Sequence, residues 1–97
     1  MKGVFIAFDQ AHRDAVIEVL DHLNCRGFSL VEQMQGRGSK TGEPHYGSHA
    51  WAAMNSGIIT VVEDSTVGSL LASLKKIDES SPMLGLRAFV WNIEQCY

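Results

Sequence analysis

The fold is decided by the stretch KGVFIAFD, residues 2–9, in which a short apolar run ends at an acidic residue. The run is rich in Val, Ile and Phe, so we expect a strand over residues 2–8. Asp9 can accept hydrogen bonds from the free N–H groups of a first helical turn, which predicts a helix directly after the strand. The helix carries an apolar stripe with the 3.6-residue period and stops before Gly27. The stripe consists of Ala11, Ala15, Val16, Val19, Leu20 and Leu23.

Strand and helix patterns continue along the rest of the chain. The later strands are predicted at residues 28–35, 58–62 and 86–93. Before the last of them, Asp64 or Ser65 can cap a second helix, which Pro82 ends. The order βαββαβ predicts an α+β, ferredoxin-like fold: a four-stranded antiparallel sheet with two helices on one face and a long loop after the second strand.

Length and composition narrow the class of protein. The 97 residues suit one domain spanning 1–97, and a hydrophobic content of 45% is that of a globular protein. A net charge of −3 gives no support to nucleic-acid binding over the whole surface. There is no apolar stretch of membrane-spanning length and no secretory signal, so we expect a cytoplasmic protein without membrane insertion. In that compartment Cys25 and Cys96 are expected as free thiols.

The predicted strands carry more apolar residues than one sheet face can use. Two helices cover only one face, yet adjacent strand positions are apolar and therefore point to both faces. These positions are Phe5, Phe8, Val61, Val62, Phe89, Val90 and Trp91. The second apolar face predicts self-association; the alternative is that residues 36–57 fold back and cover it.

A segment of about twenty residues, 36–57, separates the second and third strands, with one helical turn expected at 50–54. Loops of this length in a small domain are usually functional. Its glycines allow a ligand to approach the backbone, and the cations between them suit an anion such as phosphate or carboxylate. The residues concerned are Gly36, Arg37, Gly38, Lys40 and Gly42. Their spacing is not that of a Walker A motif, and a solvated glycine-rich turn is the alternative.

The same segment predicts a transition-metal site at His45 and His49, with Glu43 beside them. Further ligands would come from elsewhere in the chain or from a second chain, the candidates being Cys25, Cys96 and Glu94. Two exposed loop histidines are the alternative. His12 and His22, on the polar side of the first helix, are expected at the surface.

No motif marks a nucleophile, a reactive cysteine or a pair of carboxylates, so the protein is not expected to be an enzyme. Cys25, near the end of the first helix, is expected as a small buried apolar group. Trp51 and Trp91 are expected in a core or an interface.

The element order and two motifs resemble the PII-like signalling superfamily, whose best-known members are the nitrogen regulatory P-II proteins. Residues 36–42, GRGSKTG, keep the glycine spacing that opens the family's T-loop, and residues 85–94, GLRAFVWNIE, are similar to its last strand. The resemblance implies a cytoplasmic homotrimer that binds a small effector between subunits. It also implies that segment 36–57 contacts a target such as a membrane transporter or an enzyme.

The departures from the family pattern bear on the ligand. Lys40 and Thr41 stand where P-II proteins carry Gln and Lys. The family's ATP-phosphate segment is replaced here by residues 80–87, SSPMLGLR, in which Arg87 can stand in for the terminal lysine. We therefore expect weak or absent ATP binding of the usual kind, and an anion, a nucleotide or a metal ion as effector.

Residues 44–51, PHYGSHAW, look like the divergent P-II branch associated with heavy-metal efflux. The divalent-cation-tolerance proteins called CutA share the fold. A metal-binding tolerance protein without a signalling target is therefore the alternative function.

Overall fold

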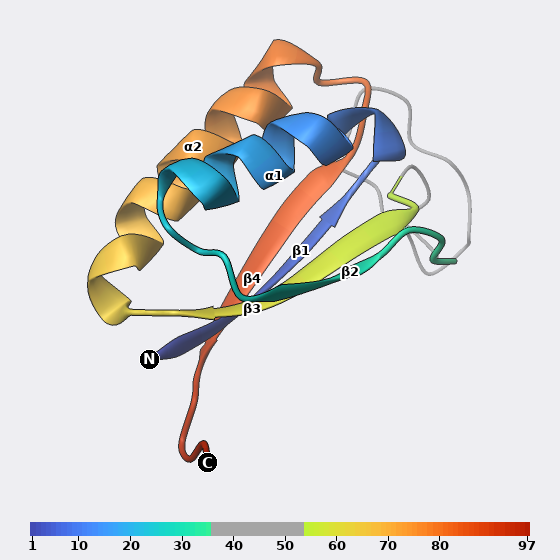
Figure 1. Ribbon diagram of the computed structural model, residues 1–97. Coiled ribbons are helices and arrows are strands. Elements are labelled where there is room, and N and C mark those ends of the chain that lie inside the picture. The colour runs from blue at the N-terminus through green and yellow to red at the C-terminus, as the bar shows by residue number, and fades with distance from the viewer. Residues whose placement is uncertain (36–53) are drawn as a thin grey trace.

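The computed structural model describes residues 1–35 and 54–97, which form one sheet with two helices on one face (Figure 1). In chain order the elements are β1 (Lys2–Phe8), α1 (Arg13–His22), β2 (Phe28–Val31), β3 (Ser56–Val62), α2 (Val67–Ser80) and β4 (Leu86–Asn92). The strands lie in the order β2-β3-β1-β4, and every neighbouring pair is antiparallel. The predicted ferredoxin-like fold is confirmed.

The register divides each strand between two faces. In the centre of the sheet Ile6 of β1 lies opposite Ile58 and Ala88, and the next residue toward the N-terminus, Phe5, lies opposite Ile59 and Phe89. Side chains of successive residues point to opposite faces. The face of Ile6 is covered by both helices and forms the core. Its buried members include Val4, Ile6, Phe8, Ile58, Val62 and Leu86 from the sheet and Val16, Leu20, Leu70 and Leu74 from the helices.

The first helix begins as the sequence predicts, but its opening turn is tighter. The Asp9 carboxylate accepts a hydrogen bond from the Ala11 N–H at 2.9 Å, which confirms the predicted cap. Residues Gln10–His12 form a 3-10 turn, and α1 itself starts at Arg13. The expectation that His12 is a surface residue is wrong, because this turn places it inside with 5% of its area exposed. His22 is exposed, as expected.

The predicted cap of the second helix is wrong. Residues Asp64–Thr66 form a 3-10 turn before α2, and neither Glu63 nor Thr66 caps with its side chain. The Asp64 carboxylate instead lies 2.9 Å from the amino group of Met1, and this hydrogen bond lowers the pKa of Asp64. The turn is closed by a backbone bond from the Thr66 N–H to the Glu63 carbonyl, at 2.9 Å.

Strand boundaries differ most beside segment 36–53. β2 ends at Val31 instead of residue 35, and β3 starts at Ser56, two residues before the expected start. After Val31 the regular hydrogen bonding between β2 and β3 ends, and isolated hydrogen bonds connect the two chain segments. The Ser56 hydroxyl donates to the Glu32 carbonyl at 2.9 Å, and the Met34 N–H donates to the Asn55 carbonyl at 2.7 Å.

Two smaller expectations concern the cysteines and the membrane. Cys25 is a member of the core, as predicted, and burial raises the pKa of its thiol. Cys25 and Cys96 are both free. Within residues 1–35 and 54–97, no helix is both long and apolar enough to cross a membrane.

Candidate functional site

The residues that flank segment 36–53 meet at one end of the sheet, where β1 and β2 finish and β3 and β4 begin. We call this the loop end. The Met34 N–H donates a hydrogen bond to the Asn55 carbonyl at 2.7 Å. This bond connects the chain just before the segment with the chain just after it. The Asp9 N–H donates to the Gly85 carbonyl at 2.9 Å, which brings the start of β4 to the same place. Four stretches that are far apart in sequence therefore converge here (Figure 1).

A pocket of about 630 Å³ opens at the loop end between Gln10, Gln33, Met34, Gln35 and Asn55. The Asn55 side-chain oxygen accepts from the Gln10 N–H at 2.8 Å, and the Asn55 N–H donates to the Phe8 carbonyl at 3.1 Å. Carboxamide side chains are neutral and both donate and accept hydrogen bonds. The pocket therefore suits a small polar molecule, and its volume lies in the range of ligand sites.

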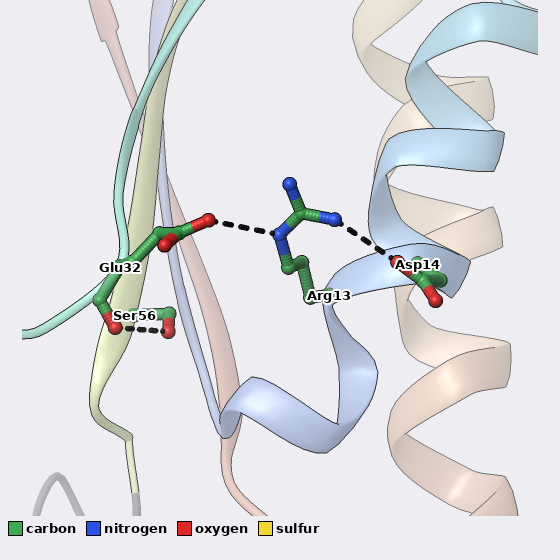
Figure 2. A network of polar contacts seen from close by, with 4 residues as sticks. All are labelled: Arg13, Asp14, Glu32 and Ser56. Atoms are coloured by element: carbon green, nitrogen blue, oxygen red, sulfur yellow. Dashed lines mark hydrogen bonds and ion pairs between the residues drawn. The ribbon is translucent and has the colours of Figure 1, made fainter.

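A polar network ties α1 to the chain entering this pocket (Figure 2). The Arg13 guanidinium lies 3.3 Å from Glu32 through Nε and 3.1 Å from Asp14 through Nη1. The Glu32 backbone is held in turn by Ser56. These ion pairs are solvent-exposed and each stabilises the fold by about 1 kcal/mol or less. Because two carboxylates already face Arg13, it is a poor candidate for an anion ligand.

Of the residues predicted for ligand binding, Arg87 lies in the described part of the chain. It is exposed near the start of β4, opposite Ala7 of β1, and Ala7 lies opposite Gly57 of β3. Arg87 thus stands at the loop end and on the face without helices. The other predicted residues lie outside the described residues: Gly36, Arg37, Gly38, Lys40, Glu43, His45 and His49. Their roles stay predictions.

The candidates for completing a metal site lie away from the loop end. Glu94 and Cys96 follow β4 after Asn92, which pairs with Lys2 at the opposite end of the sheet. A seven-residue strand places that end about 20 Å away. Cys25 belongs to the core. Residues 1–35 and 54–97 contain no group of three or more His, Cys, Asp or Glu suited to a metal ion.

Sequence analysis does not predict the carboxamides that line the pocket. Gln10, Gln33, Gln35 and Asn55 form no motif, because neutral amides occur throughout protein surfaces. One signal is present: Gln35 directly precedes the predicted loop 36–57 and Asn55 lies near its end, where hydrogen bonding between the two ends of a loop is expected.

A second surface is the face of the sheet without helices, which we call the open face. It carries Val31, Phe5, Ile59, Val61, Phe89 and Trp91, most of them 43–50% exposed. The rings of Phe5 and Phe89 stack with centroids 6.5 Å apart. Trp91 lies over Gly3 so closely that a Cβ there would be 2.6 Å from the indole. An exposed apolar surface of this kind marks an interaction site.

The described fold and surfaces can now be compared with those of known proteins. The profile of the family "Nitrogen regulatory protein P-II" matches residues 1–97. The chain therefore belongs to the nitrogen regulatory protein P-II family, a family of signalling proteins. Among curated proteins, none matches the chain.

Solved structures agree with this assignment. CPII from Thiomonas intermedia K12, a nitrogen regulatory PII-like protein bound to ADP, AMP and bicarbonate, superposes with a TM-score of 0.72 at 25% identity, over 95% of this chain and 88% of that one. A second CPII structure with the same ligands gives 0.71 at 26% identity, over 95% and 90%. A DUF3240 family protein from Shewanella baltica OS155 gives 0.72 at 18% identity, over 99% and 92%, and shows the fold alone.

Proposed function

We propose that this protein is a homotrimeric sensor that binds a small anionic effector at the loop end and signals through segment 36–53 to a target such as a transporter or an enzyme. The observation that carries the proposal is the convergence at the loop end. A polar pocket, the exposed cation Arg87 and the residues that flank the segment all lie at this end of the sheet. A ligand bound at this place contacts the chain that enters the segment and so changes the surface offered to a partner.

Anions are the ligand class that this arrangement favours. Arg87 offers a planar, permanently charged donor group, and the carboxamides add neutral donors. CPII, at about a quarter identity, is bound to ADP, AMP and bicarbonate in its structures, which names the compounds to try first. A trimer is part of the same proposal because the exposed apolar side chains of the open face favour contact with other subunits.

Calorimetry with ADP, AMP and bicarbonate tests the effector. We expect saturable binding of at least one of them to the wild-type protein, and a loss of affinity of about tenfold or more in Arg87→Ala, because a charge-assisted contact is worth about 1.5–3 kcal/mol. Arg26→Ala is the matched control, since Arg26 is exposed before β2 at the other end of the sheet. Equal affinities in the two variants would contradict the assignment of Arg87.

The transition-metal effector at Glu43, His45 and His49 is kept as a separate proposal. Titrating nickel, copper and zinc into wild-type protein and His45→Ala/His49→Ala distinguishes it from the anion. The affinity for the metal should fall as the pH is lowered through about 6.5, because the neutral imidazole is the form that binds a metal ion. Equal binding by both proteins would remove the site.

A further inference from the structure

The outer surface of the helix layer contains a groove between α1 and α2, away from the sheet. It encloses about 330 Å³. Its floor is apolar and only partly buried, consisting of Ala15 and Val19 from α1, Leu23 directly after α1 and Ile77 from α2. Val19, Leu23 and Ile77 pack against the core and remain partly exposed. The groove plays no part in the site at the loop end.

The length of the groove matches a helix. Leu23, directly after α1, is eight residues from Ala15, which corresponds to about 12 Å along the helix axis. An amphipathic helix presents its apolar anchors at i, i+4 and i+7, over nearly the same distance. An open groove of this length takes a row of side chains from such a helix better than it encloses a small molecule.

A row of three carboxylates on α1 reaches the groove at Glu18, and His22 also lines the groove. Asp14, Glu18 and Asp21 follow one another at i, i+4 and i+7, so they lie on one side of the helix, and all three are exposed. Glu18 also lines the groove itself. Asp14 forms an ion pair with Arg13. The carboxylates of Glu18 and Asp21 form no ion pair with any residue in 1–35 or 54–97. A partner that brings cations beside its apolar anchors complements Glu18 and the carboxylates next to it on α1.

We propose that the groove between α1 and α2 docks an amphipathic helix of a partner protein, with apolar residues on the floor and Lys or Arg residues facing Glu18 and its acidic neighbours. The helices lie on the side of the sheet opposite the open face (Figure 1). Self-association through the open face therefore leaves the groove accessible. This docking surface does not depend on effector binding and is separate from segment 36–53.

The probe is a helical peptide of about 18 residues with Leu at i, i+4 and i+7 and Lys between them, followed by fluorescence anisotropy. We expect saturable binding, weakened about tenfold or more when the Lys residues are replaced by Glu. Glu18→Lys should weaken it by a similar factor. Glu94→Lys makes the same change in net charge on the exposed C-terminal tail and should alter affinity by less than about twofold.

The steric test uses two alanines near the same end of the molecule. Ala15→Leu extends a side chain into the groove without a change in charge. Ala11→Leu makes the same substitution at an exposed residue outside the groove. Only the first should reduce binding. Peptide-induced shifts in the NMR spectrum of the unaltered protein should centre on Ala15, Val19 and Ile77 and spare Phe89, a readout that needs no variant to fold.

Three results would overturn the proposal. Equal weakening by Glu18→Lys and Glu94→Lys would show attraction to net charge alone. Shifts centred on the open face would place the peptide elsewhere. A change of oligomeric state in Ala15→Leu, without the peptide, would identify a second copy of this chain as the occupant of the groove.

Discussion

The two faces of the sheet are built from neighbouring residues of the same strands, yet their surroundings differ. In β3, Ile58 is fully buried under the helices, whereas Ile59, the next residue, is 50% exposed on the open face. Both faces are apolar. The comparison teaches that hydrophobic pattern assigns a residue to a face, while the elements packed on that face decide whether it stabilises the subunit or offers an interface.

The largest expected effect separates these two isoleucines. Ile58→Ala removes buried methyl groups and should lower the free energy of unfolding by about 2–5 kcal/mol. Ile59→Ala should lower it by less than about 1 kcal/mol when measured at a concentration at which the subunits are separate. Urea denaturation followed by circular dichroism gives both values. Similar losses in the two variants would mean that the open face is buried within the subunit, and the comparison would fail.

Assembly should show the reverse order. Ile59→Glu places a charge on the open face and should yield single subunits in sedimentation, whereas the wild-type protein should sediment near three times its 10.7 kDa. Leu71→Glu is the control, because Leu71 is also an exposed apolar residue but lies on α2. A wild-type protein of 10.7 kDa, or an assembled Ile59→Glu variant, would contradict the role of the open face.

A smaller effect tests how closely side chains pack on the open face. In Gly3→Ala the new Cβ would lie 2.6 Å from the Trp91 indole, so the ring must move, at a cost of about 1 kcal/mol. Gly27→Ala is the control, since a Cβ there meets nothing within 4 Å. With Trp51→Phe in both proteins, fluorescence reports Trp91 alone. We expect a shift in Gly3→Ala only; the same spectrum in both variants would show that the indole does not rest on Gly3.

The smallest effect compares a thiol beneath the helices with one on the C-terminal tail. Burial raises the pKa of Cys25, so less of its reactive thiolate is present at neutral pH, and the fraction grows only as pH rises. Cys96 is exposed. In single-thiol proteins carrying Cys96→Ser or Cys25→Ser, iodoacetamide should modify Cys25 more slowly, with a rate that increases toward alkaline pH. Equal rates at neutral pH would show that the core opens readily near Cys25.

Much of the fold could be predicted from the sequence, and the errors have local physical causes. The Asp9 cap and the two apolar sheet faces depend on neighbours in sequence and were predicted correctly. His12 was misplaced because a 3-10 turn precedes α1 and shifts the helical period. The predicted Asp64 cap is wrong because its carboxylate pairs with the amino group of Met1. A contact between residues so far apart in sequence cannot be predicted from a local pattern.

For the candidate site, the sequence predicts a role for segment 36–57 and for Arg87, but it does not predict the pocket at the loop end. Glycines, cations and histidines within one stretch are visible because their chemistry is concentrated in sequence. Gln10, Gln33 and Asn55 lie far apart in the chain and carry no charge, so only their convergence makes them a site.

The sequence by itself determined the βαββαβ order, the surplus of apolar strand residues and the family, because periodicity and motifs are local properties. The tertiary structure alone decided which apolar face the helices cover, which residues gather at the loop end, and that α1 and α2 leave a groove between them with Glu18 in its lining. The physical reason is that strand register and helix packing are set by contacts between residues distant in sequence, and those contacts form only when the whole sheet is assembled.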